Sequence, residues 1–333
     1  MSEQSCRDPL TPLLQMRSVL LADGAIGTNL FEMGLESGEA PELWCDTHPD
    51  RVALLHHAFV DAGADIVLTN SFGGTRHRLK LHNAQDDVYR LNRLAARIAK
   101  DAVEGADRTV LVAGSVGPTG ELLEPLGELT RDGAVDAFVE QMEGLRDGGV
   151  DLAWIETMSA ADEIGAAIEA ARKVGLPAVV TASFDTAGRT MMGIAPSELG
   201  AVTEGAVAVG ANCGVGASDI LASLLAMNDP RPLVVKGNCG IPEFRGTEIH
   251  YSGTVEQMAD YAKLAVDAGA SIIGGCCGTT PKHLAAMRAA IDGHVRAERP
   301  DIDTITQRIG PLANALPGVA RNAPKRRGRR RVA

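Results

Sequence analysis

The chain has 333 residues, of which 45% are hydrophobic and only 3% aromatic, as expected for a folded globular protein with an aliphatic core. Its formal net charge of −11 at pH 7 argues against a nucleic-acid partner, because phosphate contacts need clustered Lys and Arg. No apolar stretch reaches the roughly 18 residues of a membrane span, and the N-terminus has no hydrophobic signal core. We therefore expect a cytoplasmic protein with no membrane partner.

Short β-branched runs recur along the chain, and each follows a helix-like stretch and a glycine-containing turn. The eight predicted strands cover residues 19–23, 64–70, 109–115, 150–156, 177–183, 206–213, 232–238 and 270–277. Between them apolar residues recur at helical spacing, as at 50–65. Runs without polar alternation are typical of a buried parallel sheet, and eight such units predict a single-domain (β/α)8 barrel.

The segment DAGAD at 61–65 recurs in similar form as DGGVD at 147–151 and DAGAS at 267–271, which indicates a repeated helix-to-strand turn. We see no linker that divides the barrel.

We expect the barrel to cover residues 19–295, with an N-terminal extension over 1–18 and a C-terminal extension over 296–333. The basic run PKRRGRRR at 324–331 predicts a solvated, disordered tail. The sequence leaves the oligomeric state open, a homo-oligomer included.

Functional residues of such barrels gather at the carboxyl ends of the strands. The predicted ends carry Asp23, Asn70, Ser115, Glu156, Ser183, Asn212, Cys213, Lys236, Asn238, Cys276 and Cys277. This set is the candidate active site.

Two adjacent cysteines close the eighth predicted strand. Neighbouring side chains of an extended strand point to opposite faces, so Cys276 and Cys277 can serve one site only if the backbone turns there. Gly274, Gly275 and Gly278 permit such a turn.

Cys213 ends the sixth predicted strand, so its sulfur can converge with those of Cys276 and Cys277. Three thiolates favour zinc, and three protein ligands leave the fourth position open, as catalytic zinc requires. Cys239, at the end of the seventh strand, is an alternative fourth ligand that would close the site. A disulfide between the adjacent cysteines is a further alternative, although it would be strained and the compartment is expected to be reducing.

Several motifs resemble the zinc-dependent homocysteine S-methyltransferases. They are LADGAIGTNL at 21–30, IET at 155–157, GANC at 210–213 and GGCCGT at 274–279. Further segments are similar to the bacterial betaine-homocysteine branch of that family: GTNLFEMGL at 27–35, APELW at 40–44, GSVGPTGE at 114–121 and SFDTAGRTMMG at 183–193. The resemblance extends from about residue 20 to about 290.

The resemblance implies that Zn²⁺ is held by Cys213, Cys276 and Cys277. It implies no catalytic side chain beyond the zinc-activated thiolate of the substrate. In this family the position of Cys239 is usually not cysteine, so we expect Cys239 to be a local substitution and not a ligand.

The resemblance also implies a set of substrate-binding residues. Asp23 and Glu156 would hold the homocysteine amino group, and the backbone around Gly27 and Thr28 would receive its carboxylate. Trp44 would lie beside the methyl donor, with Phe72 as a second aromatic candidate. Thr157 stands where the animal betaine enzymes have an aromatic residue, while Trp154 is expected in the core.

We therefore expect methyl transfer from betaine to homocysteine, giving methionine and dimethylglycine, with both substrates free small molecules. The donor should be cationic, because a quaternary ammonium or a sulfonium leaves as a neutral amine or sulfide. The alternatives are an S-methylmethionine or other sulfonium donor, a Schiff-base aldolase using Lys236, and a zinc- or redox-responsive binding protein without catalysis.

Overall fold

The structure is a computed structural model that describes residues 8–240, 242–245 and 248–314. The predicted basic tail at 324–331 lies outside the described residues. The predicted barrel lies almost wholly within them.

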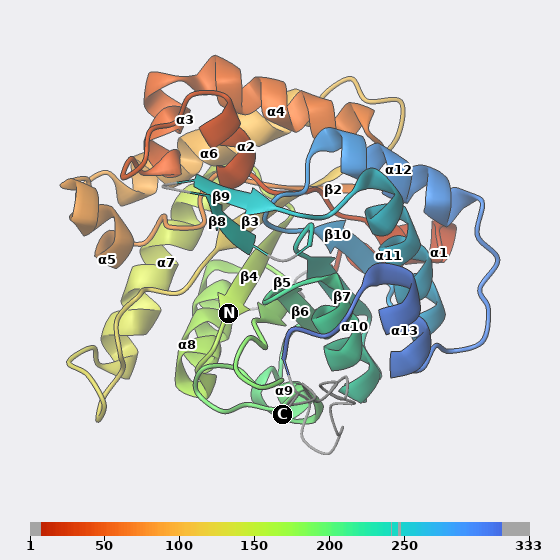
Figure 1. The fold of residues 1–333 in the computed structure, drawn as a ribbon. Coiled ribbons are helices and arrows are strands. Elements are labelled where there is room, and N and C mark those ends of the chain that lie inside the picture. The colour runs from red at the N-terminus through yellow and green to blue at the C-terminus, as the bar shows by residue number, and fades with distance from the viewer. Residues whose placement is uncertain (1–7, 241, 246–247, 315–333) are drawn as a thin grey trace, which may run out of the picture.

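Eight parallel strands form one sheet in the order β1-β10-β7-β6-β5-β4-β3-β2 (Figure 1). A parallel bridge between Ala22 and Ile66 joins the two ends of this order, so the sheet closes on itself. The strands are β1 (Leu20–Leu21), β2 (Ile66–Leu68), β3 (Leu111–Val116), β4 (Leu152–Met158), β5 (Ala178–Ala182), β6 (Ala208–Cys213), β7 (Leu233–Gly237) and β10 (Ile272–Gly275). Each coincides with a predicted strand, which confirms the (β/α)8 barrel.

Helices surround the barrel and alternate with its strands (Figure 1). The longer ones are α4 (Pro49–Asp61), α6 (Val88–Val103), α7 (Arg131–Gly148), α8 (Ala161–Val174), α10 (Ala217–Ala226), α11 (Val255–Ala268) and α12 (Pro281–Asp292). The shorter ones are α1 (Leu10–Met16), α2 (Gly27–Glu32), α3 (Trp44–Thr47), α5 (Arg76–Leu79), α9 (Leu199–Val202) and α13 (Ile302–Ile309). Within the described residues, 3₁₀ turns occur at Pro41–Leu43, Lys80–His82 and Pro196–Glu198.

Local sequence accounts for where these helices begin and where they end. The Thr130 hydroxyl accepts a hydrogen bond from the Gly133 amide at 3.0 Å and so caps α7. In the three repeated turns, Gly63, Gly149 and Gly269 have φ between +99° and +104°, a conformation that favours glycine. The predicted helix-to-strand turns are therefore confirmed.

The barrel interior is filled at its amino-terminal end by a cluster of inward-facing aliphatic side chains. Leu10 and Leu13 of α1 belong to this cluster, together with the fully buried Trp154 of β4. Helix α1 therefore closes the bottom of the barrel, and the part of the N-terminal extension that the structure describes packs as an integral part of it.

The described part of the C-terminal extension also packs on the barrel. Ile305 and Ile309 of α13 are buried, and the helix contacts α10 and α11. The Ser218 hydroxyl of α10 donates to the Gly310 carbonyl at 2.7 Å. Across residues 8–240, 242–245 and 248–314, no helix combines the length and the apolar character needed to cross a membrane.

An antiparallel hairpin that the sequence analysis does not predict follows β7. Its strands are β8 (Pro242–Arg245) and β9 (Glu248–Tyr251). Tyr251, at the end of the hairpin, lies against Gly278, where an added Cβ would come within 2.4 Å of the tyrosine ring. The hairpin therefore reaches the turn that carries the two adjacent cysteines.

Candidate active site

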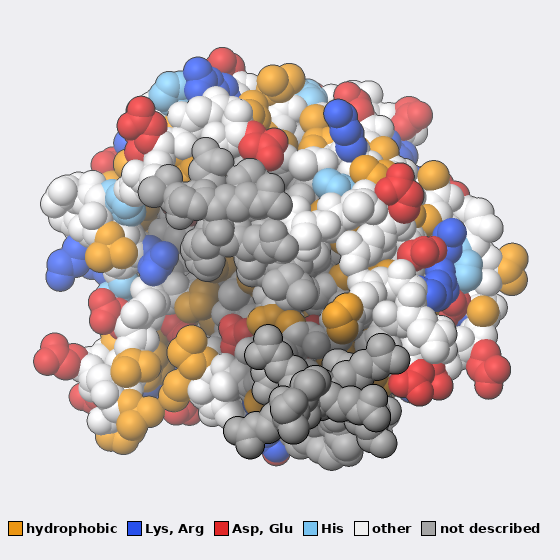
Figure 2. Space-filling model, in the orientation of Figure 1, with side chains coloured by type: hydrophobic (Ala, Val, Ile, Leu, Met, Phe, Trp, Pro, Cys, Tyr) orange, Lys and Arg blue, Asp and Glu red, His pale blue; other side chains and the backbone are white. Residues whose placement is uncertain are grey.

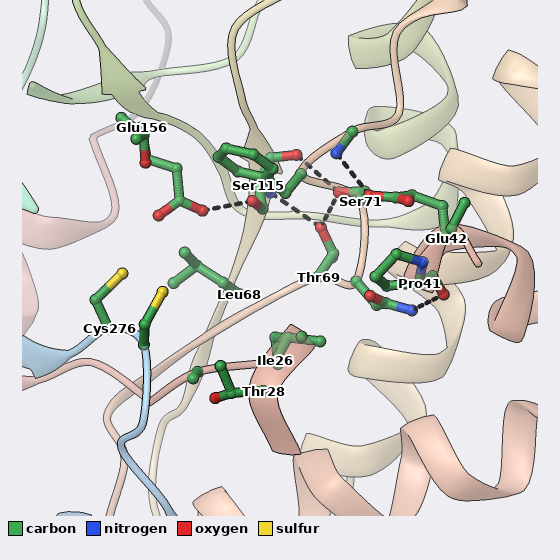
Figure 3. Close-up of a pocket in the computed structure, with 18 of the residues that line it drawn as sticks. Ile26, Thr28, Pro41, Glu42, Leu68, Thr69, Ser71, Ser115, Glu156 and Cys276 are labelled. Carbon is green, nitrogen blue, oxygen red and sulfur yellow. Dashed lines mark hydrogen bonds between the residues drawn. The ribbon is translucent and has the colours of Figure 1, made fainter. Parts of the chain in front are cut away.

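The carboxyl ends of the strands surround a cavity of about 620 Å³, a volume typical of small-molecule sites. Figure 2 shows that this face of the molecule is hollowed near its centre. The cavity wall includes Cys213, Cys276, Cys277 and Glu156, together with residues such as Pro41, Phe72 and Arg78. Figure 3 shows Cys276 and Glu156 on one side of the cavity and Pro41 on the opposite side, so the cavity has a sulfur-lined side and extends away from it.

The sulfurs of Cys213, Cys276 and Cys277 all lie within 4.8 Å of one another. Strand β10 ends at Gly275, and the chain then turns, with the Thr279 amide donating to the Cys276 carbonyl at 3.0 Å. Gly278 has φ +78°, which a residue with a side chain adopts only with strain. The predicted turn is thus confirmed, and it brings two adjacent side chains to one site.

Cys213 reaches this site from a left-handed backbone conformation, with φ +60°. Non-glycine residues seldom adopt this conformation, and it turns the side chain away from the direction that a regular strand end would give. The Asn238 side-chain amide lies 3.7 Å from the Cys213 sulfur and donates to the Gly214 carbonyl at 2.7 Å. Asn238 thereby holds the Cys213 turn against the end of β7.

The three thiols fit a zinc ion. Tetrahedral zinc with sulfur ligands at about 2.3 Å places those sulfurs about 3.8 Å apart. Thiols that lie within 4.8 Å of one another need only a small contraction to reach that spacing. Within the described residues, these three cysteines form the group of His, Cys, Asp and Glu side chains close enough to hold a metal ion.

Cys239 lies outside this group. Its side chain is buried in the hydrophobic core, and its backbone amide donates to the Cys277 carbonyl at 2.9 Å. Cys239 therefore supports the cysteine turn through its backbone.

A chain of charged side chains extends from the barrel interior to the cavity. The Lys236 ammonium lies 2.6 Å from Asp23 Oδ1, and both side chains are almost wholly buried. Glu156 Oε1 accepts a hydrogen bond from the Ser115 hydroxyl at 2.5 Å, as Figure 3 shows beside Cys276. Burial raises the pKa of Glu156, although Lys236 and Ser115 oppose that shift.

Lys236 lines the cavity, but its surroundings favour the charged ammonium over the neutral amine that a Schiff base requires. Burial opposes its charged form, but the carboxylates of Asp23 and Glu156 outweigh burial and raise its pKa above the ordinary value. A Schiff-base lysine needs a neutral amine, which requires a lowered pKa. The aldolase alternative is therefore disfavoured.

Helix α2 brings its first turn to the cavity, where Gly27 and Thr28 form part of the wall. The Thr28 hydroxyl accepts from the Gly278 amide at 3.2 Å, and the Asn29 side chain donates to the Thr279 carbonyl at 3.0 Å. These bonds fix α2 to the cysteine turn. First-turn amides of a helix have no acceptor within it, so they are available to a ligand.

The aromatic candidates occupy different positions. Trp44 is only 3% exposed and packs in the core, with the Arg51 guanidinium carbon 5.1 Å from its ring centre. Phe72 is 38% exposed and forms part of the cavity wall. Phe31, which is 49% exposed, lines the cavity as well, so Phe31 and Phe72 offer aromatic side chains there and Trp44 does not.

The structure thus brings together most of the site residues named from the sequence. Glu156, Gly27 and Thr28 line the same cavity as the three cysteines, whereas Asp23 and Trp44 do not. Sequence reasoning missed Arg78, which lies on the cavity wall in the segment after β2. The sequence feature that could have pointed to Arg78 is its position in the segment that follows the second predicted strand.

Fold and site together define a class of protein. It is a (β/α)8 enzyme with a buried acid and a candidate thiolate metal centre at the carboxyl ends of its strands. The model of the homocysteine S-methyltransferase family matches residues 20–291. The chain belongs to that family.

Solved structures of one family member support this assignment. The chain is similar to the homocysteine methyltransferase MmuM from Escherichia coli in its metallated form, with 27% identity and a TM-score of 0.71 over 85% of this chain and 99% of that one. The oxidised form of the same protein matches with 28% identity, the same coverage and a TM-score of 0.71. The likeness therefore extends over nearly the whole of that chain.

Curated relatives are much longer. Methionine synthase from Mycobacterium tuberculosis is 30% identical over 314 residues, which cover 87% of this chain and 26% of that protein. Methionine synthase from Mycobacterium leprae is 31% identical over 311 residues, which cover 84% of this chain and 25% of that protein. The chain spans about a quarter of the length of these two relatives.

Proposed function

We propose that this protein is a zinc-dependent methyltransferase that moves a methyl group from betaine to the sulfur of homocysteine, giving methionine and dimethylglycine. The observation that carries the proposal is the group of three thiols within 4.8 Å at the mouth of the barrel. Membership of the homocysteine S-methyltransferase family supports homocysteine as the acceptor. The identity of the methyl donor is tested by the assay described below.

In this proposal Cys213, Cys276 and Cys277 hold the zinc, which when bound keeps the thiol of homocysteine ionised near neutral pH. A free thiol with a pKa of about 8.5 is only a few per cent ionised there, so full ionisation gains about 2 kcal/mol. Holding sulfur and methyl carbon in line can contribute roughly 7 to 11 kcal/mol in favourable cases. The side chains that orient the two substrates therefore matter more to the rate than ionisation alone.

The homocysteine subsite lies between Glu156 and the first turn of α2. The Glu156 carboxylate would accept hydrogen bonds from the substrate ammonium, and the amides of Gly27 and Thr28 would donate to its carboxylate. These groups line the cavity together with the cysteines, and Figure 3 shows Glu156 and Thr28 on the side of Cys276. A four-carbon amino acid bound by both ends would direct its sulfur toward the thiols.

The donor subsite lies at the other end of the cavity. The Phe72 ring offers a face to a quaternary ammonium, for which cation–π attraction is well suited. Arg78 also lines the cavity and forms no ion pair within the described part of the chain, so its guanidinium is available to the betaine carboxylate. This combination favours a donor that has both a cationic methyl group and a carboxylate.

S-methylmethionine is the second candidate donor, because it also carries a carboxylate and in addition a free ammonium group. The carboxylate of Glu39 also lines the cavity and would suit that extra charge through Oε1, since its Oε2 accepts from the Glu36 amide at 3.1 Å. Glu42 is less available, since its Oε1 already accepts from the Gly73 amide at 2.6 Å.

Methionine formation in separate reactions with betaine and with S-methylmethionine tests the proposal. We expect turnover with homocysteine and betaine, with one dimethylglycine formed for each methionine. Turnover with S-methylmethionine alone would replace the donor and keep the reaction. No turnover with either donor, in protein that holds zinc, would favour the zinc- or redox-responsive binding protein instead.

A further inference from the structure

We infer that Asp219 is a positioning residue for the Cys213 thiol, and that residues 310–314, here called the C-terminal strap, hold Asp219 in place for this task. The inference rests on the proposed function, because it takes Cys213 as a ligand of zinc. The strap lies beyond residues 20–291, the part of the chain that the family model matches.

The strap follows α13 and is hydrogen bonded to the first turn of α10, the helix that lies beside α13 (Figure 1). The Ala313 amide donates to Asp219 Oδ2 and the Asn314 amide donates to Asp219 Oδ1, both at 2.9 Å. At the other end of the strap, the Gly310 carbonyl accepts from the Ser218 hydroxyl at 2.7 Å. Two adjacent residues of α10 thus bind both ends of the strap.

The Asp219 carboxylate depends on these contacts. Its side chain is buried, and a buried carboxylate without hydrogen-bond partners is costly. Burial raises the pKa of Asp219, and the amides of Ala313 and Asn314 oppose that shift. Displacing the strap would remove a hydrogen bond from each carboxylate oxygen, so Asp219 and the strap stabilise each other's position.

Asp219 lies next to the turn that carries Cys213. Residues 214–216 join Cys213 to the start of α10, and this linker includes Gly214 with φ +71° and Gly216 with φ +152°. Glycine restricts the backbone little, so the linker by itself does not fix the position of the sulfur. Asp219, Cys213 and Gly214 line one small cavity of about 10 Å³. The strap therefore anchors α10 at the point where the linker needs support.

The Cys213 turn is held from two directions. Asn238, at the end of β7, donates to the Gly214 carbonyl at 2.7 Å. The strap joins α10 to the segment after β5, because the Asn314 side chain donates to the Asp185 carbonyl at 3.2 Å. A non-glycine residue keeps a left-handed conformation, such as φ +60° at Cys213, only where its surroundings hold it there. Asp219 supplies part of that support.

The first test measures the zinc affinity of the full chain by competition with a chromophoric chelator. We expect Asp219→Ala to bind zinc about 10- to 100-fold more weakly than the unchanged protein, as is typical when a residue that orients a metal ligand is lost. Asp260→Ala is the matched control, because Asp260 also binds the C-terminal extension, through Arg308 at 2.8 Å, but from α11. Its affinity should stay within about threefold of the unchanged value. An Asp219→Ala affinity within that same range would overturn the inference.

Cobalt in place of zinc gives a readout that a loss of stability alone would not change. Co²⁺ bound by thiolates absorbs in the near ultraviolet, and the absorption per ion grows with the number of sulfur ligands. At saturating Co²⁺, Asp219→Ala should absorb less per bound ion than the unchanged protein, because Cys213 no longer binds, while Asp260→Ala should absorb equally. Full absorption in Asp219→Ala would overturn the inference even if zinc bound more weakly, since Cys213 would still be in place.

Ala313→Pro attacks the same contact from the strap and leaves the first turn of α10 unchanged. Proline has no amide hydrogen, so the bond to Asp219 Oδ2 is lost. Zinc affinity should fall in the same direction, and combining the two substitutions should add little to Asp219→Ala alone. Fully additive losses would contradict a shared contact.

The zinc titration also separates this inference from the proposed function. If the unchanged protein bound no zinc, the proposed function would fail, and the inference with it. If the unchanged protein and Asp219→Ala bound zinc equally well, only the inference would fail.

Discussion

The Asn212 side chain holds Thr157 across two strands of the barrel that are not neighbours. Its Oδ1 accepts from the Thr157 amide at 2.8 Å, and its Nδ2 donates to the Thr157 hydroxyl at 2.7 Å. Thr157 has φ +61°, at a point where the pairing of β4 with β5 shifts register. Because Asn212 precedes Cys213 and Thr157 follows Glu156, this contact joins the sulfur end of the cavity to the ammonium site.

Asn212→Ala should weaken homocysteine binding without changing the donor requirement. It removes both bonds to Thr157 and also the acceptor of the Thr181 hydroxyl at 2.7 Å, so we expect a loss of about 1 to 3 kcal/mol in unfolding free energy. The KM for homocysteine should rise several-fold, while that for betaine should stay within about twofold. Steady-state kinetics and urea unfolding measure these effects. Equal increases in both KM values would refute the link to the homocysteine subsite.

Two cysteine variants distinguish the metal site from the core. Cys276→Ser should lose zinc and methyl transfer together, because one of three thiolate ligands is replaced by a weaker one. Cys239→Ala should keep both and lose only about 1 to 2 kcal/mol of stability, since its sulfur packs in the core. Metal analysis by mass spectrometry and the transfer assay give the readouts. Release of zinc by Cys239→Ala would mean that a fourth protein ligand closes the site.

Arg78→Met should raise the KM for betaine about tenfold, because it removes the cation assigned to the donor carboxylate. The KM for homocysteine should hardly change. Arg76→Met is the matched control: Arg76 lies on the same short helix but pairs with Glu140 at 2.8 Å on the surface. Equal effects of the two substitutions would remove Arg78 from the donor subsite.

His56 should make the fold sensitive to mild acid. Both of its ring nitrogens are buried and have no hydrogen-bond partner among the described residues, and burial, with a smaller effect of His57, lowers the pKa of His56 from 6.5 to about 4. Between these two values the unfolded chain takes up a proton that the folded chain excludes, so stability falls as the pH drops through this window. The loss from pH 7 to pH 5 should be about 2 kcal/mol.

Urea unfolding at the two pH values measures this loss, and His56→Leu is the control. The leucine variant should lack that part of the pH dependence. An unchanged pH dependence in His56→Leu would show that other groups cause it.

The sequence was informative where one short segment determines the structure. The strands could be predicted because each is a continuous apolar run, as in β5, where every residue is buried. The cysteine turn could be predicted because Gly274, Gly275 and Gly278 flank the two cysteines. Placing Cys213 in the same site needed only the rule that parallel strands in a barrel end on one face.

Contacts between distant segments could not be predicted in this way. Asp23 and Lys236 are 213 positions apart, so no local pattern indicates that they form an ion pair. Trp44 lies in the long excursion between β1 and β2, and its burial depends on how α3 packs against α4 and α6. The hairpin of β8 and β9 has strands of four residues, too short for a periodic signal.

We propose that methyl transfer to homocysteine depends on a zinc ion held by the three strand-end thiols. The most direct test is methionine formation in chelated protein to which zinc is returned in measured steps. We expect no turnover without zinc, a rise in proportion to bound zinc, and a plateau at one zinc for each chain. Turnover that survives complete removal of zinc, or that stays absent at full occupancy with either donor, would contradict it.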